Sequence, residues 1–518
     1  MRRGLLVVSM MALGGSAAVG APFKVEEASI ASIHKAIQGR QTTCAAIVDQ
    51  YLARIEAYDK KGPALNAVIT INPQARQIAA REDAEIAKAG RITKPLQCIP
   101  VAVKDNYNTT DMPTTGGNLL FKNVTPAKES TVTQRLRDAG AIILMKTNMH
   151  EFALSGTTVS SLGGQTKNPY DLTRTPGGSS GGTGAALAAN FATVGLGTDT
   201  VNSIRSPANA NSLVGFRSTK GLVSRANVLP VSKTQDVVGP ITRSVADAAV
   251  MLDVIAGYDP NDPVTARSVG HVPRSFRDSL DPHGLKGARI GVLKGFVGKE
   301  PIHAEVTAAF NKAVDACKAA GATVIELDDP FFDAGAFNRD YDVQKWEFKP
   351  LFNDYLVSLG DRAPVKNLGE LIASGQFEKK TLEKFLTSSE AIADPLQDKE
   401  YLARLAKLDD LRDRLLNHMA AERLDAVVYP EQMRLVVPIT ETNQADRTGI
   451  LAGLTGFPAV TVPMGFSKPD QNAPIGVPMG IDMIGRPFSD ALLVKLAYSF
   501  EQATKVHRPP QSTPALRK

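Results

Sequence analysis

One stretch rich in glycine and serine, residues 174–207, constrains this chain of 518 residues more than any other. It begins with Gly-Gly-Ser-Ser-Gly-Gly at residues 177–182 and ends in a polar turn that holds Ser203. Glycine costs backbone entropy on folding, so glycines at this density indicate unusual dihedral angles or close backbone approach. Such stretches are often flexible linkers. Here, however, an alanine-rich run typical of a helix and an apolar run typical of a buried strand follow at once. The stretch therefore predicts an active-site loop.

The same stretch matches the Gly-x-Ser-x-Gly pattern of the nucleophile elbow in serine hydrolases, centred on either Ser179 or Ser180. That elbow needs a strand directly before it, whereas residues 168–176 contain two prolines and several turn formers. A phosphate-binding loop is excluded because no Gly-Lys-Ser/Thr follows the glycines. An α/β-hydrolase-type esterase that uses Ser180 and a histidine stays an alternative, because the members of a catalytic triad meet in space and not in sequence.

Helix-like and strand-like patterns alternate along most of the chain, which favours an α/β fold. The alternation predicts one large domain over residues 25–510, with a central mixed β-sheet covered by helices on both faces. The expected helices are residues 131–139, 180–189, 244–257 and 302–320, and the expected strands are residues 99–103, 141–145, 192–197, 289–293 and 322–327. Between about 330 and 400 the pattern weakens and aromatic residues gather, so we expect a variable helical insertion that covers the site.

Composition excludes several classes of function. Hydrophobic residues make up 43% of the chain and charged residues 22%, which is typical of a globular protein with a large core. The net charge of +6 is small, and no basic run is interleaved with aromatic residues, so we expect no nucleic-acid partner. Neither the histidines nor Cys44, Cys98 and Cys317 have the spacing of metal ligands, and no metal or other cofactor is expected. The cysteines allow at most one disulfide, and we expect buried thiols instead.

Residues 1–20 have the pattern of a secretory signal peptide. A short basic start precedes an apolar run over residues 5–13 and a stretch of small residues, with a suitable cleavage point after Ala18 or Gly20. The apolar run is too short to span a membrane. We therefore expect export to the periplasm or the medium, removal of the signal peptide, and no membrane association afterwards.

Three separate motifs resemble those of the amidase signature hydrolases. The glycine-serine block is followed by Gly-Thr-Asp-x-x-x-Ser-Ile-Arg-x-Pro at residues 197–207, which places Ser179 and Ser203 24 positions apart, as in that family. The family's lysine stands in Val-x-Val-Lys-Asp-Asn at residues 101–106, as Lys104. Further matches at residues 146–151, 239–247 and 478–487 extend the resemblance over about residues 31–504. The resemblance implies the amidase signature fold and an amidase activity.

An amidase must activate a weak nucleophile against a poor electrophile, so it needs a base for the serine and donors for the oxyanion. The resemblance implies that Lys104 is the base, Ser179 a relay on a cis peptide bond, and Ser203 the acylated nucleophile. A lysine at the end of a strand is usually solvated, and it acts as a base only if burial lowers its pKa. The resemblance also implies an oxyanion hole made by the backbone amides of Thr200, Val201, Asn202 and Ser203.

The chain departs from the family at two places. Val201 and Asn202 stand where the family most often has two glycines, and Cys98 stands where it usually has glycine. Valine with positive φ would be strained, so the loop needs ordinary dihedral angles there. The larger side chains are expected to narrow the site, and Asp199 and Arg205 are expected to tie the loop together.

The sequence thus predicts an exported serine hydrolase that cleaves a carboxamide through an acyl-enzyme on Ser203. The expected substrate is a small-molecule or peptide amide, but which amide, and the state of assembly, stay open. Two further alternatives are kept. One is a component of the tRNA-dependent amidotransferase, which belongs to the same family but works in the cytosol with partner subunits. The other is a catalytically inactive binding protein, which would be expected to have lost Lys104 or Ser203.

Overall fold

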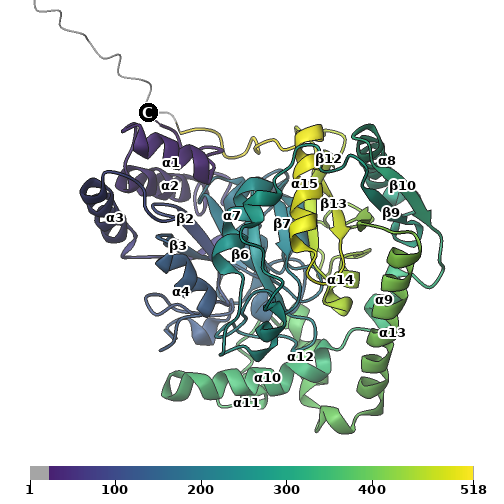
Figure 1. Cartoon of the computed structure of the whole chain (residues 1–518). Helices are drawn as coiled ribbons and strands as arrows, with labels where there is room; N and C mark the ends of the chain where they lie inside the picture. Colours follow the sequence, from purple (N-terminus) through teal and green to yellow (C-terminus); the bar gives the residue numbers. More distant parts are fainter. Residues whose placement is uncertain (1–22, 517–518) are drawn as a thin grey trace, which may run out of the picture.

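The computed structural model describes residues 23–516 and has one large β-sheet at its centre (Figure 1). The expected signal peptide, residues 1–20, lies outside the described residues. The sheet contains β1 (Val68–Ile71), β2 (Pro100–Lys104), β3 (Ile142–Thr147), β6 (Val194–Asp199), β7 (Val214–Arg217), β8 (Val237–Thr242), β9 (Arg289–Leu293), β10 (Thr323–Leu327), β11 (Ala426–Pro430), β12 (Ala459–Phe466) and β13 (Pro478–Ile484). Two short strands, β4 (Val159–Ser160) and β5 (Gly164–Gln165), pair only with each other.

The sheet is mixed, as the sequence predicts. Its strand order is β1-β3-β2-β6-β8-β7-β12-β13-β11-β9-β10. β2 runs parallel to β3 and β6, and β9 runs parallel to β10 and β11, whereas the remaining neighbours are antiparallel. Every residue of β2, β3 and β6 is buried, which requires cover on both faces of the sheet. The topology therefore places β2, which ends in Lys104, beside β6, which leads into the loop with Ser203.

Helices supply the cover on both faces (Figure 1). They are α1 (Ile30–Gln38), α2 (Cys44–Tyr58), α3 (Ala75–Ala89), α4 (Thr131–Asp138), α5 (Gly181–Ala188), α6 (Arg205–Ala210), α7 (Val245–Ile255), α8 (Ala304–Ala319), α9 (Ala334–Asp340), α10 (Gln344–Leu359), α11 (Leu368–Ser374), α12 (Lys379–Glu390), α13 (Lys399–Ala421), α14 (Ile450–Thr455) and α15 (Asp490–Thr504). α5 and α6 pack against the central strands, as do α7 and α15. Within residues 23–516, no helix combines the length and the apolar character needed to cross a bilayer.

Local sequence determines where several of these helices begin. Thr43, Ser130 and Ser244 each precede a helix, and each side-chain oxygen accepts a hydrogen bond from the backbone N–H three residues on. Such caps satisfy donors that the first helical turn leaves free. α4 and α5 begin and end within one residue of the expected helices, and β9 has the expected bounds. The helix and strand patterns of the sequence therefore locate these elements well.

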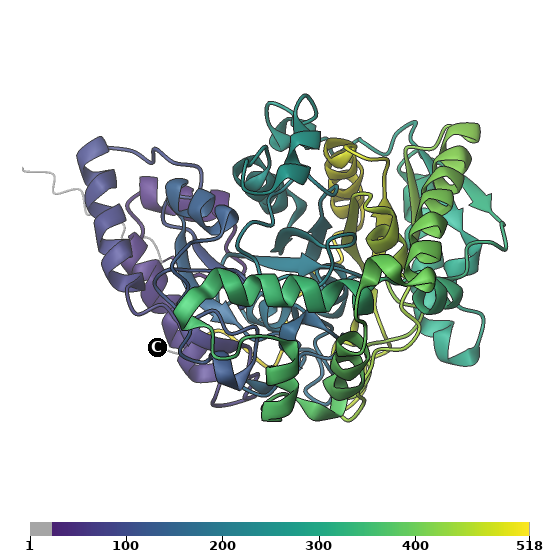
Figure 2. The same cartoon turned by 90° about the horizontal axis from the view of Figure 1, so that it is seen from below.

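The region expected to hold a helical insertion contains α9 to α13 and extends to residue 421. Seen from below, α10 lies across the molecule (Figure 2), and α12 packs against it. Phe348 and Phe352 of α10 share a hydrophobic cluster with Leu382 and Leu386 of α12 and with Phe152, which follows β3. The helical region is thus anchored beside the end of β3. Its variability between relatives stays a prediction.

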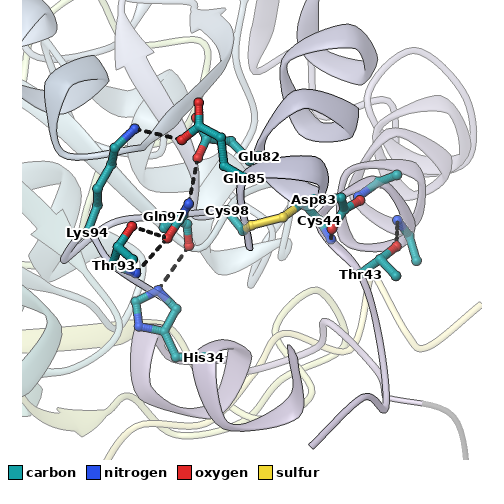
Figure 3. Close-up of a disulfide and its surroundings, with 12 residues drawn as sticks. His34, Thr43, Cys44, Glu82, Asp83, Glu85, Thr93, Lys94, Gln97 and Cys98 are labelled. Atoms are coloured by element: carbon teal, nitrogen blue, oxygen red, sulfur yellow. Dashed lines mark hydrogen bonds and ion pairs between the residues drawn. A yellow bond between two sulfur atoms is a disulfide. The ribbon is translucent and has the colours of Figure 1, made fainter. Parts of the chain in front are cut away.

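The expectation of buried free thiols is wrong for two of the three cysteines. Cys44, the first residue of α2, and Cys98, shortly before β2, form a disulfide with Cα atoms 5.0 Å apart (Figure 3). Cys317 is a buried free thiol, as expected. The two bonded residues are 54 positions apart, so their pairing depends on how α2 packs and could not be derived from spacing alone.

The surroundings of the disulfide anchor its Cys44 end. Asp83 of α3 accepts hydrogen bonds from the backbone N–H groups of Cys44 (2.7 Å) and Ala45 (3.0 Å), which anchors the start of α2 (Figure 3). Cys98 has a φ of 66°, which lies in the left-handed region that favours glycine. The departure from glycine at Cys98 is therefore linked to a covalent bond that holds α2 next to the start of β2.

Candidate active site

The three residues expected to carry the chemistry meet at the ends of β2 and β6. Lys104 is the last residue of β2, and its Nζ lies 2.7 Å from Ser179 Oγ and 2.7 Å from Thr198 Oγ1 on β6. Ser179 follows a cis peptide bond. Ser203 lies between β6 and α6, and its carbonyl accepts a hydrogen bond from the N–H of Ser180 (3.3 Å). The fold thus brings together three segments that are far apart in the sequence.

The glycines of the block allow these segments to approach each other. Gly177 has a φ of 72°, and a Cβ atom there would lie 2.7 Å from the carbonyl oxygen of Ser206. A Cβ atom at Gly182 would collide with the backbone of Asn148, which follows β3. A larger residue at either position would push Ser179 away from its neighbours. The glycine-serine block is therefore a tightly packed turn and not a linker.

Lys104 is a buried lysine that forms no salt bridge with any described residue. Its burial disfavours the charged form of the side chain. Its exposed fraction is 0%. Burial lowers the pKa of Lys104 from 10.5 to about 7, although Asp199 and Asp236 favour the charged form. Lys146 of β3 is equally buried but pairs with Asp105 at 3.0 Å. Near neutral pH, Lys104 is therefore uncharged in a large share of molecules and can then accept a proton.

A buried network of charges fixes the turn that carries Ser203. Asp199, at the end of β6, accepts hydrogen bonds from Arg217 Nη1 (2.6 Å) and Arg205 Nε (3.2 Å). Arg205 Nη2 also donates to the carbonyl of Val201 (2.7 Å). Burial opposes the charge of Asp199, but the two arginines outweigh it and hold its pKa below the usual value. Asp199 and Arg205 thus tie the loop together, as the sequence predicts.

Val201 and Asn202 have ordinary dihedral angles, since neither is among the residues with positive φ. The side chain of Val201 lies in a hydrophobic cluster with Leu451 and Leu454 of α14. Asn202 is also buried, and its Nδ2 donates to Glu431 Oε1 (2.7 Å). The loop therefore accommodates side chains at both positions without left-handed backbone. The expected narrowing of the site stays a prediction.

Access distinguishes the three residues. Ser203 has an exposed fraction of 7%, whereas Lys104 and Ser179 have 0%. All three residues are buried, and Ser203 is the least buried of them. A cavity of about 410 Å³ lies beside Thr198 and Thr200, and α10 forms part of its wall. Because α10 and these two threonines line the same cavity, the helical region lies near the loop that precedes Ser203.

Several residues around the site were not predicted from the sequence. Thr198 contacts Lys104, and Thr200 Oγ1 donates to Asp236 Oδ1 (2.7 Å). Thr198 could have been inferred, because it belongs to the same motif as Ser203. Asp236 precedes β8 and Glu431 follows β11, and neither carries a local signal of its role. Their positions follow only from the packing of the strands around the loop.

Ser180 lacks the surroundings of a nucleophile elbow. The residues before it, 168–176, form turns and isolated bridges instead of a strand. Ser180 Oγ is buried and donates to the carbonyl of Thr198 (3.3 Å). His150 donates its backbone N–H to the carbonyl of Ser179, but its ring contacts two threonines. Within the described residues, the α/β-hydrolase alternative therefore has neither the strand nor a histidine base.

Comparison with known proteins agrees with the motifs. The model of the Amidase family matches residues 46–494. The chain is 33% identical to a probable amidase of Arabidopsis thaliana over 98% of this chain and 97% of that protein. It is 32% identical to a glutamyl-tRNA(Gln) amidotransferase subunit of Microcystis aeruginosa over 93% of this chain and 98% of that protein. The solved structure of native peptide amidase from Stenotrophomonas maltophilia matches with a TM-score of 0.85, at 35% identity over 95% of this chain and 99% of that chain.

Proposed function

Since this chain belongs to the amidase signature family and is an amidase that hydrolyses C–N bonds, we propose that it forms an acyl-enzyme on Ser203. Lys104 is the base in this proposal, and Ser179 is the relay. One observation carries it: Lys104 Nζ lies 2.7 Å from Ser179 Oγ, in a buried position that lowers the lysine's pKa to about 7. A lysine in that state can take the role that histidine has in other serine hydrolases.

In the acylation step, Ser203 Oγ attacks the carbonyl carbon of the amide and passes its proton to Ser179, while Ser179 passes its own proton to Lys104 Nζ. The backbone N–H groups of residues 200–203 donate to the oxyanion. When the C–N bond breaks, the proton on Lys104 returns through Ser179 to the leaving nitrogen, which departs as ammonia or an amine. Water then attacks the acyl carbon by the same proton path and releases a carboxylic acid.

The proposed substrate is a peptide amide or a small amide. The similarity to the peptide amidase from Stenotrophomonas maltophilia, which extends over 95% of this chain, supports this class. A cavity that combines apolar walls from Leu229 and Val231 with polar groups such as Asn227 lies beside Thr198, and Ser203 is not among its lining residues. Cavities of this mixed character are typical of sites for small ligands.

A component of the tRNA-dependent amidotransferase is the competing candidate, because relatives with that name share 32% identity with this chain. Two features favour an enzyme that acts alone outside the cytosol. Residues 1–20 have the pattern of a signal peptide. Cys44 and Cys98 form a disulfide, a bond that persists in oxidising compartments and is rare in the cytosol. We therefore propose that the enzyme works in the periplasm or the medium.

The proposed activity can be tested by measuring ammonia release from a C-terminally amidated peptide. The purified chain should release ammonia without any partner protein. Ser203→Ala should abolish the release, whereas Ser180→Ala, the matched control from the same block, should retain it. If Ser203→Ala released ammonia at the wild-type rate, the proposal of an acyl-enzyme on Ser203 would be wrong. Release that required added amidotransferase subunits would favour the competing candidate.

Export can be tested separately. When the full chain is expressed, the protein should be recovered from the periplasmic fraction or the medium, with an N-terminus at Val19 or Ala21. Recovery from the cytoplasm with residues 1–20 still attached would contradict the proposed location.

A further inference from the structure

A carboxyl group from a distant part of the chain holds Asn202. Glu431 follows β11 directly, and its Oε1 accepts a hydrogen bond from Asn202 Nδ2 at 2.7 Å. Both side chains are buried. The two residues are 229 positions apart, so the contact exists only because the fold brings the end of β11 to the loop after β6. The hydrogen bond joins that loop to a second part of the sheet.

Two glycines make room for this arrangement. A Cβ atom at Gly449, just before α14, would lie 2.5 Å from Asn202 Cβ and 3.1 Å from Glu431 Oε1. A Cβ atom at Gly453, within α14, would lie 2.5 Å from the carbonyl oxygen of Thr200. The loop that carries the Asn202 side chain thus packs against residues 449 and 453, where glycine leaves room for it. The segment around α14 is complementary to this particular loop.

Within the described residues, Glu431 forms no salt bridge, because the nearby cations pair with other carboxylates. Arg205 Nη1 donates to Asp482 Oδ2 (2.6 Å), and Arg205 and Arg217 both pair with Asp199. Burial, reinforced by the negative charge of Asp482, raises the pKa of Glu431 well above its usual value. The ion pairs of Arg205 and Arg217 are therefore made with Asp199 and Asp482, and not with Glu431. The charged form of Glu431 is therefore disfavoured, and its Oε1 serves as an acceptor for Asn202.

We propose that Glu431 is a positioning residue, which holds the backbone of residues 200–203 in the geometry that binds the oxyanion through its hydrogen bond to Asn202. This inference rests on the proposed function. Glu431 does not touch the reacting atoms and acts only through the loop. Oxyanion donors act mainly in the transition state, so their misplacement lowers kcat more than it changes KM.

Substitutions at both ends of the hydrogen bond test the proposal. Glu431→Leu removes the acceptor and leaves Asn202 Nδ2 buried without a partner, so we expect kcat to fall about tenfold or more while KM changes little. Glu431→Gln has nearly the shape of the carboxyl group and keeps an oxygen acceptor, so it should retain most of the wild-type kcat. The double variant Asn202→Gly/Glu431→Leu removes the stranded amide and should recover part of the loss.

Hydrogen exchange of the peptide that contains residues 200–203 reports on the loop without reference to catalysis. Exchange should be faster in Glu431→Leu but not in Glu431→Gln. Asp490→Leu is the matched control, because it removes another buried carboxyl group, one that accepts hydrogen bonds from Thr219. It should leave exchange of the loop unchanged even if it lowers the melting temperature.

The outcomes separate the two proposals. Unchanged exchange in Glu431→Leu, or an equal loss of kcat in Glu431→Leu and Glu431→Gln, would overturn the positioning role. Failure of the wild type to form an acyl-enzyme on Ser203 would instead overturn the proposed function. In that case the exchange measurement still decides whether Glu431 holds the loop.

Discussion

Lys104 and Lys146 lie near the ends of neighbouring parallel strands, both fully buried, yet their environments differ. Lys146 pairs with Asp105, whereas the Nζ of Lys104 lies within hydrogen-bonding distance of two hydroxyl groups. A lysine at a strand end is usually solvated, so the local sequence alone predicts a charged side chain at both positions. Both side chains are buried, and the absence of a salt bridge at Lys104, within the described residues, makes it different. These properties arise from packing on both sides of β2.

The pKa of Lys104 predicts how activity depends on pH. Because Lys104 must be uncharged to accept a proton, kcat/KM should rise with pH through an apparent pKa of about 7. Below that pH the lysine is protonated, and activity should fall. Lys104→Ala should lower kcat by a factor of about 10²–10⁴ and remove this acid limb. A pH–rate profile of the wild type with an acid limb above pH about 9 would contradict an uncharged lysine.

Some residues of the site can be identified from the sequence, and others cannot. Lys104, Ser179 and Ser203 each stand in a short motif, so the match to a known family assigns their expected roles. Asp236 and Glu431 stand in no such motif, and their contacts with Thr200 and Asn202 appear only in the folded chain. The residues that support the loop come from elements distant in the sequence, and for this reason local patterns could not identify them.

Most elements of the sheet could be located from hydrophobic patterns and capping residues, because these signals lie within a few neighbouring positions. β9 has the expected bounds, and α4 and α5 differ from expectation by one residue. The disulfide between Cys44 and Cys98 could not be located in this way. It depends on α2 packing beside the segment before β2, which no short window of sequence encodes.

Loss of that disulfide should lower stability more than activity. The two cysteines are 54 positions apart, and a loop of that length corresponds to about 4 kcal/mol in the chain-entropy estimate. Lys104 lies in β2, which is paired on both sides, so kcat should be largely kept well below the melting temperature. Melting temperatures measured with and without reductant test this expectation.

The double variant Cys44→Ser/Cys98→Ser is the control for this measurement. Its melting temperature should match that of the reduced wild type and should not respond to reductant. Complete reduction of the wild type without a change in melting temperature would rule out a structural role for the bond.

At the scale of the whole molecule, Glu347 makes one of the contacts that join the helical region of α9 to α13 to the segment before β8. Glu347 of α10 accepts hydrogen bonds from the N–H of Thr234 (3.0 Å) and from the hydroxyl of Tyr401 on α13 (2.8 Å). The alternating pattern of the sequence predicted the α/β class and a single large domain. The extent of the helical region could not be derived, because its cover over the sheet depends on contacts such as these.

Glu347→Leu should loosen this connection. The substitution leaves the half-buried N–H of Thr234 and the buried hydroxyl of Tyr401 without their partner, so the free energy of unfolding should fall by about 2–4 kcal/mol. Denaturant unfolding measures this change, and hydrogen exchange should be faster in α10. Glu370→Leu on the exposed side of α11 is the control and should change stability by less than about 0.5 kcal/mol. Equal stability of both variants would show that Glu347 does not hold the helical region.

The central claim is that Ser203 accepts the acyl group with the help of Lys104 and Ser179. Intact mass spectrometry after treatment with a fluorophosphonate tests it most directly, because the reagent labels an activated serine. We predict one adduct on the wild type and on Ser180→Ala, none on Ser203→Ala, and slow labelling of Lys104→Ala. An adduct that remained on Ser203→Ala, or that disappeared in Ser180→Ala, would contradict the assignment of Ser203 as the nucleophile.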